Sequence, residues 1–326
     1  SSDVCSSDLW LLEAGNYILM AGNSSDDAAA AAVLYLPQDV ITAQGRTCCA
    51  PVKPVDEIMA PVKSWDEPDN VRRLTINPLA FQTVRFDYTE PAVHETVEEK
   101  RLLDSFSTED LVSLVVGGDL RAQDPAIHAP TGVGGRTSLD LRSHGIGNVA
   151  FCDGPAGVNI IDHAVVLGHG QEQAFEIPEK YNFGELAEMA KTWSGKLEGT
   201  HVYRFATAWP VGLLLAQTWN TALVERVGFG AGRELVEFGV TLWLAPGMNI
   251  HRNPLCGRNF EYYSEDPLLT GKMAAATTRG VQKHPGIGTT IKHFCCNNQE
   301  DNRTGVSSNV SERSLREIYL KGFEIA

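Results

Sequence analysis

The composition of this 326-residue chain is that of a globular protein, and its charge narrows the partners that the protein can have. Hydrophobic residues make up 43% and charged residues 21% of the chain, which is enough for a real core in one large domain or two ordinary ones. The formal net charge of −14 argues against nucleic acid or an anionic membrane as the main partner, because both attract basic surfaces. No run of about 18 apolar residues predicts a transmembrane helix.

Residues 1–9, SSDVCSSDL, are expected to be a sequencing or assembly artefact and not native protein. The stretch repeats Ser-Ser-Asp, lacks an initiator Met and reads like a translated adapter. Genuine upstream coding sequence, in frame through this stretch, would contradict that hypothesis. No basic segment precedes an apolar core here, so no signal peptide is predicted.

Residues 10–37 are expected to form β-strands, with turns at 15–16 and 22–23, and two such strands alone would be marginal in water. We therefore interpret 10–37 as the tail of a β-sandwich. Residues 38–96 are interpreted as a connector, because seven of the sixteen prolines lie between 37 and 91 and disfavour helices. An edge strand is expected within it at 83–88.

From residue 97 onward, helical and strand patterns alternate, which predicts parallel β/α architecture. The expected strands are 149–152, 205–207, 242–245 and 289–293. The expected helices begin near 97 and at 107, and continue with 214–238 in more than one piece, 271–282 and 312–326; a glycine-rich loop is expected at 131–136. A closed (β/α)8 barrel needs eight strands and roughly 250 residues, so about four strands predict part of a barrel.

Polar residues gather where these strands end, and at that place α/β barrels carry their active sites. Asp153, followed by Gly-Pro, could accept hydrogen bonds from two hydroxyls or form an Asx-turn. Arg258, among acids and aromatics, could grip a polyol or belong to a surface ion-pair loop. Lys292 and His293 could serve a site or simply end a strand in a salt bridge.

Other chemistry is not predicted. The sequence has no Walker A segment, no strand–G-x-G-x-x-G–helix context and no H-E-x-x-H or C-x-x-C spacing, so we expect no cofactor and no metal. Among seven cysteines, Cys48–Cys49 and Cys295–Cys296 are adjacent pairs. We expect free thiols, which mildly favour a reducing, cytoplasmic compartment. Trp209 and Trp219 are expected to pack in the barrel.

Three motifs together resemble the barrel domain of family 3 glycoside hydrolases, the β-glucosidase family, over residues 97–326. They are DGPAG at 153–157, GRNFEYYSEDP at 257–267, and KHF at 292–294 followed by NNQE at 297–300. The resemblance implies a TIM-type barrel in which Asp153, Arg258, Lys292 and His293 bind the hydroxyls of the sugar at the cleavage subsite. Residues 10–37 resemble the fibronectin-III-like domain of these enzymes, here placed before the barrel in the inverted domain order.

The resemblance also implies a retaining mechanism, with an Asp nucleophile and a second carboxylic acid that serves as acid and base. The family's Ser-Asp-Trp nucleophile motif does not occur in this sequence, so we expect it beyond Ala326, and the acid/base in an upstream domain. The isolated chain is therefore expected to be inactive. The expected substrate of the parent enzyme is a β-glucoside or oligosaccharide, and the parent could be a homo-oligomer.

Two alternatives stay open. One keeps the family but changes the sugar, for example to a β-xyloside. The other is a non-catalytic carbohydrate-binding protein. The hexosaminidase branch is disfavoured, because Cys295–Asn298 stands where that branch carries Pro-Gly-His-Gly.

Overall fold

The computed structural model describes residues 9–24, 26–56, 70–86, 94–116, 133–136, 144–145, 149–160, 163–167, 172–175, 200–203 and 205–326. Residues 1–8 of the expected artefact lie outside this part, whereas Leu9 begins a strand. The chain divides into two compact units, Ser1–Val93 with Asn309–Leu315, and His94–Ser308 with Arg316–Ala326.

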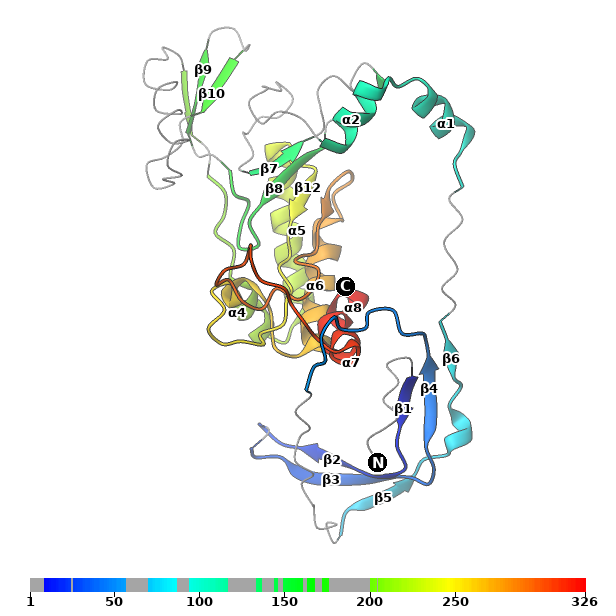
Figure 1. Cartoon of the computed structure of the whole chain (residues 1–326). Coiled ribbons are helices and arrows are strands. Elements are labelled where there is room, and N and C mark those ends of the chain that lie inside the picture. The colour runs from blue at the N-terminus through cyan, green and yellow to red at the C-terminus, as the bar shows by residue number, and fades with distance from the viewer. Residues whose placement is uncertain are drawn as a thin grey trace. The chain divides into compact units, whose positions relative to one another are not determined.

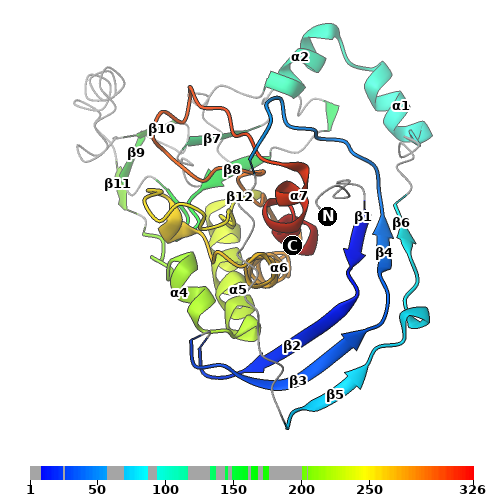
Figure 2. The same ribbon diagram turned by 60° about the horizontal axis from the view of Figure 1, so that its bottom comes forward.

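The first unit is built from two three-stranded sheets (Figure 2). In one, β2 (Gly15–Ala21) pairs antiparallel with β3 (Ala29–Leu36), and β5 (Arg72–Thr75) runs parallel to β3. In the other, β1 (Leu9–Leu12) pairs antiparallel with β4 (Val40–Gln44), and β6 (Val84–Arg85) runs parallel to β4. A short 3-10 helix, η1, spans Pro78–Ala80. The strands predicted within 10–37 are confirmed, and β6 lies within the edge strand expected at 83–88. Strands β4 and β5 show that the expected connector also supplies strands that were not predicted.

The buried carboxylate of Glu312 connects residues 309–315 to the rest of this unit. The Glu312 carboxylate, 3% exposed, accepts hydrogen bonds from the backbone N–H groups of Cys48 and Cys49 at 2.9–3.1 Å. The predicted cap is confirmed, because Ser311 Oγ accepts from the N–H of Ser314 and starts α7 (Glu312–Ser314).

In the second unit, two capped helices come first (Figure 1). Helix α1 (Val97–Asp104) begins with a capping box in which Thr96 Oγ1 accepts from Glu99 N and Glu99 accepts from Thr96 N. Helix α2 (Thr108–Val116) begins with the predicted Ser107 cap, which accepts from Asp110 N at 3.1 Å. The glycines expected to end this helix, at 117 and 118, lie outside the described residues.

A four-stranded sheet follows, in the order β13–β12–β8–β7. Strands β8 (Ala150–Asp153), β12 (Leu242–Leu244) and β13 (Gly288–Thr289) are parallel, and β7 (Val133–Arg136) is antiparallel to β8. Residues 133–136, expected as a glycine-rich loop, are thus a strand. A separate antiparallel sheet holds β9 (His163–Leu167), β10 (Glu172–Phe175) and β11 (Thr200–Tyr203).

Helices connect the parallel strands, as the alternating pattern predicted. Helices α4 (Gly212–Gln217) and α5 (Thr221–Phe238) lie between β8 and β12 in sequence, and α6 (Pro267–Val281) lies between β12 and β13. Asn220 caps the start of α5, and Gly239, with φ 71°, ends it in the left-handed conformation that glycine accepts. Asp266 caps α6, followed by proline in its first turn.

Helices α5 and α6 approach each other closely because glycine stands where they meet. A Cβ on Gly280 would collide with the Glu225 carbonyl on α5. A Cβ on Gly228 would likewise collide with the Thr277 carbonyl on α6. This close pair packs against the sheet and forms the core. One apolar cluster consists of Cys152, Val158, Ala231, Leu235, Phe238, Val240, Trp243, Ala245 and Val281.

Several local predictions were wrong. Residues 205–207, expected as a strand, are not one; Thr207 instead donates to Glu234 on α5. Strand β13 is shorter than predicted, and beyond it only one isolated bridge pairs Lys292 with Gly247. Trp209 packs on the core as expected, whereas Trp219 is 77% exposed.

The expected last helix is broken into α7, a π-helical stretch η4 (Leu315–Tyr319) and α8 (Lys321–Ile325). Of the helices in the described ranges, none combines the length and apolarity needed to cross a membrane. The parallel strands seen in these ranges establish a mixed α/β fold with a parallel sheet; they do not display a closed barrel, nor does the first unit display a fibronectin-III-like sandwich.

Candidate functional site

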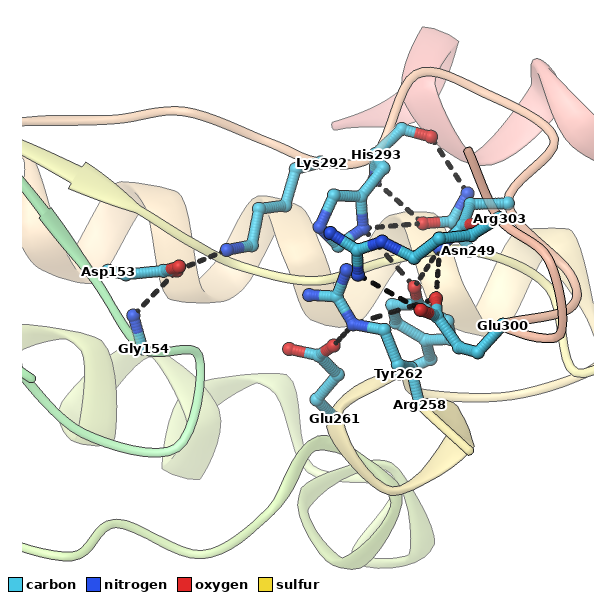
Figure 3. A network of polar contacts seen from close by, with 11 residues as sticks. Asp153, Gly154, Asn249, Arg258, Glu261, Tyr262, Lys292, His293, Glu300 and Arg303 are labelled. Atoms are coloured by element: carbon cyan, nitrogen blue, oxygen red, sulfur yellow. Dashed lines mark hydrogen bonds and ion pairs between the residues drawn. The ribbon is translucent and has the colours of Figure 1, made fainter. Parts of the chain in front are cut away.

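Polar side chains from three chain segments meet beyond the carboxyl ends of the parallel strands (Figure 3). Asp153 is the last residue of β8, and Lys292 and His293 come shortly after β13. Arg258 directly precedes the 3-10 helix η3 (Asn259–Glu261), in the long segment that follows β12. Side chains converge at this edge because parallel strands end on the same side of a sheet.

Lys292 and Asp153 form an ion pair, in which Nζ of Lys292 donates to Oδ1 of Asp153. The same oxygen accepts the N–H of Gly154 at 2.9 Å. The two interpretations of Asp153, a turn-forming carboxylate and a site carboxylate, are therefore compatible, since Oδ1 makes the turn bond. Within the described residues Oδ2 accepts no hydrogen bond, and the side chain is 39% exposed, so this oxygen can serve a ligand.

Asn249 holds the backbone on both sides of His293. Its buried side chain, in a residue 1% exposed, accepts from the His293 N–H at 2.6 Å. Its amide nitrogen donates to the carbonyls of His293 and Cys295, both at 2.8 Å. The peptide between Lys292 and His293 is cis. One amide side chain thus fixes the position of three consecutive residues.

The His293 imidazole is neutral at pH 7. Desolvation on burial, together with the positive charges of Arg258 and Lys292, lowers its pKa to about 4. Its Nδ1 lies 3.2 Å from both Asn249 Oδ1 and the Tyr262 hydroxyl. Burial raises the pKa of Tyr262 to about 12, so this hydroxyl keeps its proton. Since Nδ1 is engaged, Nε2 is the ring atom available to a ligand.

Arg258 is fixed by carboxylates on two segments. Its Nε donates to Glu261, whose side chain is 5% exposed, and lies 3.9 Å from Glu300 Oε1. Desolvation acts to raise the pKa of Glu300, but hydrogen bonds from Asn297 and Arg303 prevail and lower it. Arg258 engages these acids through Nε, and its two terminal amino groups make no hydrogen bond within the described residues.

All four residues predicted for the site are therefore near one another. Asp153 and Lys292 are in direct contact, His293 adjoins Lys292, and Arg258 is connected to His293 through Glu300, Asn297 and Tyr262. The sequence reasoning missed Asn249. The sequence does contain a signal for it, because a single Asn between the apolar Met248 and Ile250 indicates a buried amide that must hydrogen-bond within the protein.

This arrangement can bind a polyhydroxylated ligand. It combines a carboxylate oxygen as acceptor, a neutral imidazole, and cationic donors on Lys292 and Arg258. Charge-assisted hydrogen bonds of this kind are about twice as strong as neutral ones. Where the structure describes the chain, no group of three or more His, Cys, Asp or Glu side chains could hold a metal.

Comparisons with known proteins identify relatives of this chain. Residues 186–326 match the model of the glycosyl hydrolase family 3 N-terminal domain. Beta-glucosidase A of Butyrivibrio fibrisolvens is 34% identical over 349 residues, which cover 97% of this chain and 36% of that protein.

Two solved structures are similar as well. A β-glucosidase from Paenibacillus barengoltzii is 29% identical with a TM-score of 0.63, over 98% of this chain and 32% of that one. β-Glucosidase 3B from Thermotoga neapolitana in complex with α-D-glucose is 42% identical with a TM-score of 0.52, over 70% of this chain and 27% of that one.

These comparisons show homology to glycoside hydrolases. The chain belongs to the family 3 β-glucosidases and covers their N-terminal domain region. It spans about a third of the length of the curated relatives that it matches from end to end, 36% of one and 30% of another.

Proposed function

We propose that this chain supplies part of the sugar-binding subsite of a retaining β-glucosidase. In this proposal Asp153, Arg258, Lys292 and His293 bind the hydroxyls of a terminal, non-reducing β-glucosyl residue. The observation that carries the proposal is the ion pair between Lys292 and Asp153, which brings together residues 139 positions apart. The relative solved with α-D-glucose supports the choice of sugar.

In this proposal each residue has its own task. Asp153 Oδ2 accepts a hydrogen bond from one hydroxyl, while Lys292 Nζ donates to its neighbour, because the two groups lie side by side. Two adjacent sugar hydroxyls fit such an acceptor–donor pair. Arg258 donates from its terminal amino groups, and His293 offers Nε2. Contacts that strengthen as the sugar distorts in the transition state accelerate cleavage as well as binding.

We further propose that β8, β12 and β13 are consecutive strands of a TIM-type barrel. Their parallel pairing in chain order, with helices between them, supports this architecture. The strands of the first unit are proposed to belong to a fibronectin-III-like domain that precedes the barrel in an inverted domain order. The alignment of a β-glucosidase over 97% of this chain supports the order of the two parts.

The bond-breaking groups are proposed to lie elsewhere in the protein. A retaining glycosidase needs a nucleophilic carboxylate and an acid/base about 5–5.5 Å apart. The site carboxylates Asp153, Glu261 and Glu300 each already hold a cation, which suits binding and orientation. This chain by itself is therefore expected to bind sugar without cleaving it.

A test separates binding from turnover. Calorimetry should detect glucose binding to this chain, weakened in Asp153→Ala and unchanged in the control Glu225→Gln, whose carboxylate pairs with Arg279 and Lys283 away from the site. In the full-length gene product, Asp153→Ala should lower kcat/KM for an aryl β-glucoside by roughly 100-fold or more.

The same assay decides between the alternatives. Faster turnover of an aryl β-xyloside would favour the xylosidase. Sugar binding without turnover by the full-length product would favour a non-catalytic carbohydrate-binding protein. Unchanged binding and kinetics in Asp153→Ala would remove Asp153 from the site.

A further inference from the structure

Two thiols lie together shortly after His293 in the chain. The sulfurs of Cys295 and Cys296 are 3.5 Å apart, and both residues are partly exposed. Two sulfurs that each bond one central atom at about 2.3 Å, the zinc–thiolate length, lie roughly 3.8 Å apart at a tetrahedral angle. The pair therefore already has nearly the spacing of a two-sulfur chelate.

The missing further ligands and the geometry of neighbouring cysteines limit what the two thiols can bind. A structural zinc site needs four ligands, and the described residues contain no cluster of three or more His, Cys, Asp or Glu side chains that could complete one. A disulfide between neighbours is strained, because adjacent Cα atoms lie about 3.8 Å apart, below the usual minimum of about 4.4 Å. With a zinc site and a disulfide excluded, the remaining ligand is a soft central atom that binds only two thiols, because thiols prefer soft central atoms.

We propose that the Cys295–Cys296 dithiol is a covalent binding site for organic trivalent arsenicals. In the reaction with phenylarsine oxide, both thiols condense with the arsenic. The arsenic–oxygen double bond is replaced by two arsenic–sulfur bonds, and the two thiol protons leave with the oxygen as one water molecule. Arsenic stays trivalent, so no oxidant or reductant is required.

The protonation state of the thiols sets the rate of this condensation. Burial, followed by the neighbouring Cys295, raises the pKa of Cys296 to about 12, so its thiol is protonated at neutral pH. Because the thiolate is the attacking form, labelling should become faster as the pH rises.

Occupation of the dithiol would also reach the sugar site. The Cys295 carbonyl is held by Asn249, and the same side chain holds the N–H and the carbonyl of His293. A rigid ring through both sulfurs restricts the backbone at Cys295 and so disturbs that hydrogen bond. The effect on sugar affinity, unlike the arsenical site itself, rests on the proposed function.

The chain offers a comparison pair in Cys48–Cys49. There the Cys48 thiol donates to the Arg46 carbonyl at 3.3 Å, and both cysteines are exposed. An exposed pair can still react, so the test uses the background variant Cys48→Ser/Cys49→Ser. In that background, Cys295→Ser and Cys296→Ala each remove one half of the site.

Intact mass and thiol titration with phenylarsine oxide test the site. We expect the background variant to take up one phenylarsine and to lose two reactive thiols. Excess monothiol should leave the adduct in place, whereas 2,3-dimercaptopropanol should remove it. Neither single variant in that background should keep an adduct against monothiol. No uptake by the background variant, or an adduct that monothiol removes, would overturn the proposal without relying on any variant that folds poorly.

The link to the sugar site has its own readout. The ring resonances of His293, assigned with His293→Gln, should shift on labelling, and an unchanged spectrum would overturn the link. Glucose affinity should fall roughly fivefold, the size expected from one lost neutral hydrogen bond. If the unlabelled chain does not bind glucose, the proposed function fails, while the mass and NMR results still decide the arsenical site.

Discussion

The Asn249 side chain hydrogen-bonds both backbone polar groups of His293. It accepts from the N–H at 2.6 Å and donates to the carbonyl at 2.8 Å. The two residues lie 44 positions apart, one after β12 and the other after β13. The Asn249 amide also donates a third hydrogen bond, to the Cys295 carbonyl. The position of the His293 imidazole therefore depends on a buried amide from another segment of the chain.

Replacing Asn249 with Ala should destabilise the chain and weaken sugar binding together. The variant leaves one backbone N–H and two carbonyls without their partner, at a cost of about 2–4 kcal/mol in the free energy of unfolding. Urea unfolding and glucose calorimetry would measure the two effects. Asn298→Ala, which removes a single bond to the Ile250 carbonyl, is the matched control and should cost less. Equal losses in both variants would contradict the bridging role.

Acid should destabilise the chain through His293. The folded-state pKa, about 4, lies below the unfolded value of about 6.5, so the unfolded state binds more protons between these pH values. Stability is thus retained above pH 6.5 and lost as pH falls toward 4. The loss from this one group between pH 7 and pH 5 should be about 2 kcal/mol.

His293→Gln isolates that contribution. The variant cannot take up the proton, so its urea midpoint should change less between pH 7 and pH 5 than that of the unmodified chain. Other titrating groups affect both proteins alike and cancel in the comparison. Parallel pH profiles for the two proteins would show that His293 is not held neutral by burial.

Tyr262→Phe should weaken sugar binding with little effect on folding. The change removes only the hydroxyl that contacts His293 Nδ1 and accepts from Asn297. The ring stays, and the residue is fully buried, so packing is kept. We expect a loss of about 1 kcal/mol in binding free energy, seen as a roughly fivefold weaker glucose affinity in calorimetry. Tyr263→Phe, whose hydroxyl bonds Thr277 inside the core, should leave glucose affinity unchanged.

Gly280→Ala should loosen the contact of α5 with α6. Alanine usually improves a helix, but here its Cβ would meet the Glu225 carbonyl and the Phe229 nitrogen. Overpacking against backbone should cost about 1–3 kcal/mol of unfolding free energy. Gly257→Ala, where a Cβ would meet nothing within 4 Å, should change stability by less than about 0.5 kcal/mol. A stabilised Gly280→Ala would mean that the helices can move apart.

Local sequence patterns predicted most helices of the second unit, but not the strands β7, β9, β10 and β11. Ser107 and Ser311 cap N–H groups that lie only three residues away. Because these contacts are local, the sequence alone predicts where the helices begin. The strands β8 and β12 were also predictable, because their apolar runs must be buried in any fold. Residues 205–207 were also predicted as a strand but do not join a sheet, because Thr207 bonds Glu234 on α5. A short apolar run alone therefore does not determine a strand.

The sequence by itself determined the candidate residues of the site, because Asp153, Arg258, Lys292 and His293 stand in polar motifs that follow predicted strands. Only the tertiary structure decided how they are held. The Lys292–Asp153 pair, the Arg258–Glu261–Glu300 cluster and the Asn249 bridge join segments far apart in the chain. Such bonds leave no local periodicity, and they form only when parallel strands bring their carboxyl ends to one edge of the sheet.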